Sequence, residues 1–252
     1  MNFRKLAMIL ALSSVACAFF CPESFATPRK NSSVLRVEAT AGSFAGGGYT
    51  AYFSENAIRV EIHSGYTVVA HGPDWAATVF TDVGRTYCTL PRAVWEKSGL
   101  FSEPCYLPSD SKIDMVVFKK VPCRRASFNS VIDDMYMQVR SAQVPATMEY
   151  YVTDSLPCGK EQEKLFSILC ACVYLNAMPI YEKRTGARKS SVDFNVTKWY
   201  QVPLTTGMFT APSGYERVST LSLVVNSQSG KTIRAMFGDD EDQPQAKVKA
   251  TK

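Results

Sequence analysis

Apolar and polar residues alternate in short runs along most of this 252-residue chain. In residues 58–63, for example, Ile58, Val60 and Ile62 are apolar and the positions between them are polar. A period of two is typical of a strand with one buried and one exposed face. Further runs of this kind, separated by turn residues, predict strands at residues 34–40, 66–71, 75–81, 85–90, 112–120, 124–128, 135–142, 147–153, 180–183, 190–200, 215–218 and 221–226. This succession of short strands favours one curved antiparallel sheet or barrel over alternating βαβ units.

Two segments predict helices instead. Residues 91–99 begin with proline and end with glycine, which is typical of a short helix. From residue 160 to residue 175, apolar side chains recur at a spacing of three or four, and Gly159 and Pro179 flank this run. The expected fold class is therefore α+β, mainly antiparallel β, with one long helix as a cover on the sheet.

The first 26 residues have the pattern of an export signal. A basic start precedes an apolar run at residues 6–20, and residues 24–26 supply the small-x-small pattern that signal peptidase accepts. The run is too short to span a bilayer. We therefore expect an exported, periplasmic or extracellular protein whose mature chain begins near Thr27. In the alternative, Cys17 carries a lipid anchor and holds the protein on a membrane face.

The mature chain shows no internal repeat and no break between domains. Residues 27–33 are polar and contain proline, so we expect a flexible lead-in. Residues 34–237 are expected to form a single β-rich domain. Residues 238–252 are charged and nearly lack bulky apolar side chains, which predicts a disordered tail.

Composition excludes few classes of protein. The chain is 46% hydrophobic and 20% charged, which is ordinary for a globular domain. Its net charge of +5 comes without a cluster of basic residues. Because a nucleic-acid footprint requires Lys and Arg gathered on one face, no nucleic-acid partner is expected.

Six cysteines follow the signal segment, an even number in a chain bound for an oxidising compartment. This predicts disulfides, although six cysteines permit 15 pairings and the sequence does not choose among them. The candidates are Cys88, Cys105, Cys123, Cys158, Cys170 and Cys172. A zinc site would require C-x₂-C spacing or nearby histidines, and the closest pair has neither. No metal site is therefore expected.

No pattern typical of a catalytic site is present. The chain has two histidines, His63 and His71, and no G-x-S-x-G turn that would expose a serine nucleophile. The adjacent acids Asp133 and Asp134 fit a turn. We expect a protein that is not an enzyme and requires no cofactor; a hydrolase that uses two carboxylates is the alternative.

The apolar faces of the strands are candidates for a ligand cavity. Large curved sheets can enclose such a cavity, and methionine adapts to irregular guests. The residues expected to line it are Val60, Ile62, Trp75, Phe80, Met115, Val117, Met137 and Trp199. The alternative is an ordinary packed core.

Residues 193–218, with the sequence DFNVTKWYQVPLTTGMFTAPSGYERV, carry a resemblance to a known family. The stretch resembles the C-terminal signature of exported proteins with the lipoprotein-carrier fold, the LolA/LolB-like superfamily, and an uncharacterised exported branch is the closest likeness. The matching pairs are Val202-Pro203, Met208-Phe209, Ala211-Pro212 and Gly214-Tyr215. Upstream, residues 51–62 (AYFSENAIRVEI), the strand at Trp75 and Tyr87 look like the early strands of that family.

The resemblance implies a strongly curved, unclosed barrel whose concave face is covered by the long helix and the short helix, with an apolar cavity between them. Family members bind lipids or the acyl chains of lipoproteins and are not enzymes. The six cysteines depart from the family pattern, and no functional residue can be carried over. We therefore expect a non-enzymatic protein of outer-membrane lipoprotein sorting that binds a lipid or acyl chain and contacts membranes without a transmembrane helix. A structural or protein-interaction module of the cell envelope with a solidly packed interior is the alternative.

Overall fold

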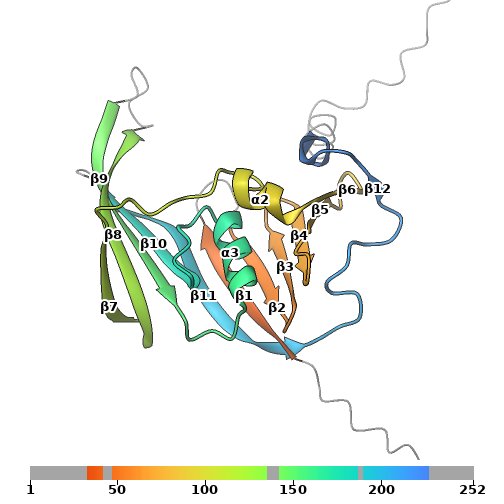
Figure 1. Ribbon diagram of the computed structural model, residues 1–252, viewed down its shortest axis with the longest axis horizontal. Helices are drawn as coiled ribbons and strands as arrows, with labels where there is room; N and C mark the ends of the chain where they lie inside the picture. Colours follow the sequence, from red (N-terminus) through yellow and green to blue (C-terminus); the bar gives the residue numbers. More distant parts are fainter. Residues whose placement is uncertain (1–32, 42–46, 135–141, 187–189, 227–252) are drawn as a thin grey trace, which may run out of the picture. The chain divides into compact units, whose positions relative to one another are not determined.

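A single large sheet dominates the structure. The protein is described from a computed structural model, which places residues 33–41, 47–134, 142–186 and 190–226. Within these residues, twelve strands lie in the order β12-β6-β5-β4-β3-β2-β1-β11-β10-β9-β8-β7 (Figure 1). All neighbours are antiparallel except β12, which pairs with β6 in parallel. The sheet is curved and unclosed, so the predicted mainly antiparallel, unclosed architecture is confirmed.

The strands have the following bounds in chain order: β1 (Ser33–Ala41), β2 (Tyr49–Phe53), β3 (Ala57–Ile62), β4 (Tyr66–His71), β5 (Ala77–Thr81), β6 (Thr86–Leu90), β7 (Lys112–Phe118), β8 (Val121–Asp134), β9 (Ala142–Thr153), β10 (Met178–Gly186), β11 (Ser190–Pro203) and β12 (Glu216–Arg217). The helices are α2 (Arg92–Ser98) and α3 (Lys160–Leu169), followed by a helical segment at residues 221–226.

The alternation in β3 behaves as predicted. Ile58, Val60 and Ile62 are buried, whereas Arg59 and Glu61 lie on the opposite face and form an ion pair of 2.8 Å. Each strand of this kind places its apolar side chains on the face toward the core and its polar side chains on the other face. Alternation in the sequence therefore gives the sheet one apolar and one polar face.

The second helix is shorter than the predicted range of residues 160–175. α3 begins after Gly159, whose backbone N–H donates to the Gln162 side chain at 2.7 Å. It ends at Leu169, because Ala171 adopts a left-handed φ of 54° that an α-helix cannot continue through. The ten-residue α3 is therefore no longer than an ordinary helix.

One predicted strand is a helix. Residues 221–226 are helical, and Leu221 and Val224, three positions apart, both pack against the main core. A spacing of three places two side chains on one face of a helix, whereas in a strand they would point to opposite faces. The run was too short for its periodicity to distinguish the two.

Several predictions fall outside the described residues. These are the signal at residues 1–26, the tail at 238–252 and the strand at residues 135–142 except for its last residue. The expected lead-in at residues 27–33 is likewise outside, apart from Ser33, which begins β1. In the part of the chain that the structure places, no helix is long and apolar enough to cross a membrane.

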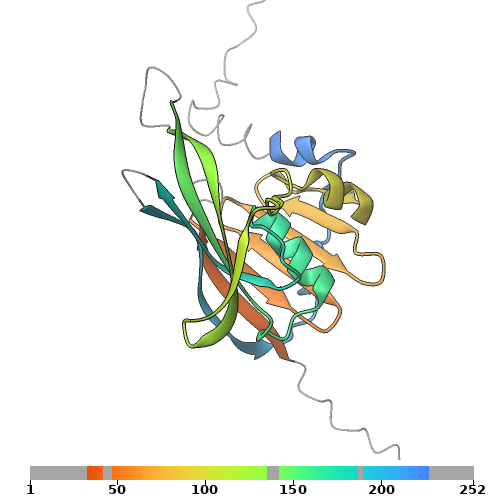
Figure 2. The same ribbon diagram turned by 60° about the vertical axis from the view of Figure 1, so that its left-hand side comes forward.

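The core lies between the sheet and α3, which contacts β3 and β10 (Figures 1 and 2). Four aromatic rings fill the space beneath α3: Phe166 from the helix contacts Phe53 at 5.7 Å and Phe194 at 6.0 Å between ring centroids, and Tyr49 packs beside them. All four are buried. These rings contribute to the apolar area that the helix removes from water, together with Leu165, Ile168 and Leu169.

Candidate functional site

Three of the residues expected to line a cavity are part of the packed core. Val60, Ile62 and Trp75 are buried in the main apolar cluster. The backbone carbonyl of Trp75 also accepts a hydrogen bond of 2.8 Å from the indole of Trp95, which lies on α2 and is itself buried. These side chains pack against other side chains of the protein.

Phe80 belongs to the other face of the sheet. Its neighbour Val79 points into the main core, so Phe80 points away from it. There its ring contacts Tyr215 edge-to-face at 6.0 Å, and the Arg59 guanidinium lies 5.7 Å from its centroid. Phe80 therefore cannot line one cavity together with Val60 and Ile62.

The remaining candidates are also dispersed. Trp199 on β11 is partly buried and packs against the main core, and Met137 lies outside the described residues. Met115 and Val117 are 72% and 79% exposed on β7, the last strand of the sheet. The expectation of one enclosed cavity is thus corrected for the seven described residues, which occupy the core, the opposite face and an open edge.

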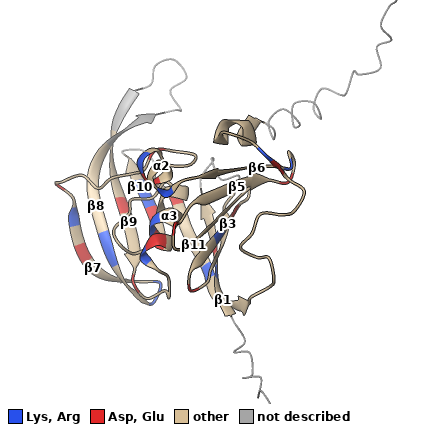
Figure 3. Ribbon diagram, turned by 45° about the vertical axis from the view of Figure 1, so that its right-hand side comes forward, with Lys and Arg blue, Asp and Glu red and all other residues tan. Residues whose placement is uncertain are grey.

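The edge strand β7 instead presents a row of exposed apolar side chains. Ile113, Met115 and Val117 point to one face, and we call these three residues the β7 strip. The charged residues of β7, Lys112 and Asp114, alternate with them and point to the other face, where the Asp114 carboxylate forms an ion pair of 2.9 Å with Arg125. Figure 3 shows a basic and an acidic segment on the β7 ribbon. The strip is therefore an uncharged apolar surface.

The β7 strip continues a buried apolar face. Ile113 lies opposite Ala126 on β8, and Ala126 lies opposite Tyr150 on β9, so all three side chains share one face. Ala126 and Tyr150 are buried in a second cluster that also receives Val173 from the segment after α3. The face is covered at β8 and β9 and becomes open at β7.

A cation borders the strip. Arg124 on β8 lies opposite Met115 and therefore points to the same face. Its guanidinium contacts the Asp154 carboxylate at 3.2 Å and the Asn176 carbonyl at 3.3 Å. The open apolar row thus has the Arg124–Asp154 ion pair at its inner margin.

A buried carboxyl group lies further along the same face. Glu182 on β10 lies opposite Tyr150 and accepts a hydrogen bond from the Cys172 thiol at 3.6 Å. Burial, together with the nearby Asp193 carboxylate, raises the pKa of Glu182 to about 7. Near neutral pH this carboxyl group is therefore partly protonated. The sequence did not predict this buried carboxyl group, because an acidic residue in a strand is normally expected on the exposed face.

All six cysteines have free thiols, so the structure joins none of the candidates predicted to form disulfides. Those six are Cys88, Cys105, Cys123, Cys158, Cys170 and Cys172. Burial raises the pKa of each thiol, to about 12 for Cys158, and this holds them in the unreactive protonated form. The disulfide prediction used the even number of cysteines and the expected oxidising compartment, and neither shows where the thiols lie in the fold.

Both histidines of the chain lie at exposed positions. His63 contacts the Thr50 hydroxyl at 3.2 Å, and His71 is exposed at the end of β4. Within the residues that the structure places, no group of three or more His, Cys, Asp or Glu side chains could hold a metal ion.

Comparisons with known proteins give no family for this chain. No family model matches it, and no curated protein matches it. Among solved structures, it is similar to the crystal structure of an uncharacterized conserved protein from Thermus thermophilus, at 11% sequence identity and a TM-score of 0.39. That similarity covers 75% of this chain and 91% of the Thermus chain.

Proposed function

We propose that this chain is an exported, non-enzymatic protein that binds a lipid or the acyl chain of a lipoprotein. The observation that carries the proposal is the β7 strip, an exposed and uncharged apolar row that continues a covered apolar face. In this proposal the helices cover the concave face of the sheet, and the acyl chain lies beside them at its open β7 end. The resemblance to the lipoprotein-carrier superfamily supports the same assignment.

The chemistry of the strip suits a flexible hydrocarbon. Each methylene removed from water contributes about 0.8 kcal/mol, so contact with three apolar side chains provides several kcal/mol. Met115, at the centre of the strip, adapts its shape to an irregular guest. Arg124 beside it, which is paired with Asp154, has further N–H donors that an acidic headgroup can accept from.

The test is a titration of the purified mature protein with a fluorescent fatty acid. We expect saturable binding that Val117→Asp weakens at least tenfold, because an acid on the strip must lose water when the chain lies over it. Val83→Asp is the matched control, since Val83 is an exposed valine on the turn between β5 and β6. A wild-type protein that shows no saturable binding, and retains no hydrophobic ligand in native mass spectrometry, would contradict the proposal.

The second candidate is a structural or protein-interaction module of the cell envelope. The filled space beneath α3 favours it, because Tyr49, Phe53, Phe166 and Phe194 leave a solidly packed interior there. β7 is also an edge strand, and an edge can add a strand from another protein. The same titration separates the two functions, since only the first requires saturable binding of a fatty acid.

A further inference from the structure

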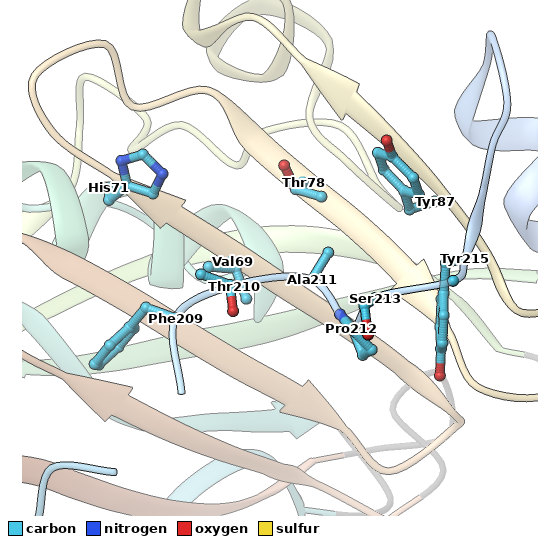
Figure 4. Close-up of a pocket in the computed structure, with 11 residues that line it drawn as sticks. Val69, His71, Thr78, Tyr87, Phe209, Thr210, Ala211, Pro212, Ser213 and Tyr215 are labelled. Carbon is cyan, nitrogen blue, oxygen red and sulfur yellow. The ribbon is translucent and has the colours of Figure 1, made fainter. Parts of the chain in front are cut away.

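A pocket lies on the face of the sheet opposite α3. Along β4, β5 and β6, the side chains of Val68, Val79 and Cys88 point into the main core. Their neighbours Val69, Thr78 and Tyr87 therefore point the other way, and these form the floor of the pocket. Residues 209–215, which we call the strap, cross over these strands and form its other wall (Figure 4).

The strap is fixed at both ends. Before it, the backbone carbonyl of Met208 accepts a hydrogen bond of 3.1 Å from Arg59. At its other end, the Tyr215 hydroxyl donates to the Asp82 carboxylate at 2.6 Å, and its ring packs against Phe80. The next residue, Glu216, begins the parallel pairing with β6. A pocket between a sheet and a strap anchored in this way is formed before any ligand arrives, so little binding energy is spent on ordering it.

The lining combines aromatic rings with hydroxyl groups. Tyr87 and Tyr215 stand at one end of the pocket and Phe209 at the other, with Thr78 and Ser213 between them (Figure 4). None of the eleven described residues that line it is Asp, Glu, Lys or Arg. Its volume is about 380 Å³, toward the small end of the range for small-molecule sites.

Some of the hydroxyl groups are available to a ligand. The Thr78 hydroxyl shares a hydrogen bond of 3.0 Å with Thr89 and retains further capacity. Within the described part of the chain, the hydroxyls of Tyr87 and Ser213 make no hydrogen bond. The pocket therefore offers uncharged donors and acceptors beside ring faces.

We propose that this pocket binds a neutral sugar ring, either a free monosaccharide or the terminal residue of a glycan. A pyranose presents apolar C–H faces, which pack on aromatic rings, and hydroxyls at its rim, which exchange hydrogen bonds with Thr, Ser and Tyr. Among the described lining residues there is no Lys or Arg, and His71 is the single basic side chain. This disfavours phosphorylated ligands, which would lose hydration without a permanent countercharge. The small volume disfavours an extended peptide, which would need a longer groove.

The experiment is a saturation-transfer and chemical-shift NMR titration of the mature protein with glucose, galactose, mannose and N-acetylglucosamine. We expect at least one of them to bind saturably and to lose at least tenfold in affinity in Tyr87→Ala and several-fold in Ser213→Ala. Tyr106→Ala is the matched control, because Tyr106 is an exposed tyrosine that does not line the pocket. Tyr87→Phe keeps the ring and should keep most of the affinity, which separates a lost contact from a misfolded strand.

Further ligands distinguish the source of the sugar and the class of the ligand. If cellotetraose or chitotetraose binds more tightly than the monosaccharide, the site takes the end of a glycan; if not, it takes a free sugar. The proposal is overturned if no sugar in the two sets saturates the protein. It is equally overturned if binding is undiminished in both Tyr87→Ala and Ser213→Ala, or if a proline-rich peptide occupies the site and no sugar does.

This site is independent of the β7 strip. Val117→Asp should leave sugar binding unchanged, and Tyr87→Ala should leave fatty-acid binding unchanged, because the two sets of residues lie on different strands and opposite faces. Failure of one proposal can thus be recognised without reference to the other.

Discussion

Glu182 shows how one buried residue can make stability depend on pH. Its pKa is raised to about 7 in the folded protein, from 4.5 for a solvated glutamate. Burial is the main cause of this shift; of the groups around Glu182, Asp193 adds to the rise in pKa, and Tyr150, Cys172 and Arg184 oppose it. The folded state holds the Glu182 proton more tightly than the unfolded state. The contribution of this proton to the free energy of unfolding is therefore fully present below about pH 4.5 and is lost as the pH rises through about 7.

We expect Glu182→Gln to remove this dependence. The wild-type free energy of unfolding should fall by about 2–3 kcal/mol more than that of the variant between about pH 5 and about pH 8. Urea denaturation at the two pH values measures the difference. Glu103→Gln makes the same chemical change at an exposed position and should retain the wild-type pH dependence. Parallel curves for the wild type and Glu182→Gln would show that the carboxyl group is solvated.

At the scale of elements, Gln162 joins the start of α3 to the sheet by hydrogen bonds. Gln162 is buried, and its amide nitrogen donates at 2.7 Å to the backbone carbonyls of both Ser54 and Ala57, at the turn between β2 and β3. Its amide oxygen accepts from the Gly159 backbone at the start of the helix. One residue thus caps α3 and satisfies two carbonyls of a neighbouring turn.

Gln162→Ala should therefore destabilise the protein by about 2–4 kcal/mol, because the Ser54 carbonyl and the Gly159 N–H lose their side-chain partner in a buried region. The Ala57 carbonyl keeps the hydrogen bond of 2.9 Å from the Ser54 backbone N–H. Chemical denaturation measures the loss. Gln201→Ala, at an exposed position on β11, should change stability by less than about 0.5 kcal/mol. An equal effect of the two substitutions would mean that water replaces the lost hydrogen bonds of Gln162.

The elements themselves were largely predictable, and the site was not. The period of two in residues 58–63 located β3, and the punctuation at residues 91–99 located α2 within one residue at each end. Phe80 was expected to line the cavity with Val60 and Ile62, because the pattern of residues does not show which face of the sheet α3 covers and which the strap covers. That pattern could not show that β7 is an edge either, so Met115 and Val117 were expected to be enclosed. Pairing order depends on contacts between residues far apart in the sequence.

At the scale of the whole sheet, one edge is covered by a short strand and the other is open. The β6 edge is covered by β12, where the Glu216 backbone N–H donates to the Arg85 carbonyl at 2.8 Å. The other edge, β7, has no further strand among the described residues and carries the exposed apolar strip. Edge strands with exposed apolar residues associate with other chains unless charges block them.

Met115→Lys combined with Val117→Lys should reduce concentration-dependent self-association of the ligand-free protein, because two ammonium groups on an edge oppose strand pairing and resist burial. Both side chains are exposed in the wild type, so the free energy of unfolding should change by less than about 1 kcal/mol. Light scattering across a concentration series measures association, and denaturation checks stability. Val83→Lys combined with Val94→Lys adds the same charge at two exposed valines outside β7 and should leave association unchanged. If both pairs of substitutions lower association equally, net charge is responsible and the β7 edge has no special role. If only the β7 pair lowers association, the open edge is the surface on which this protein meets its apolar partners.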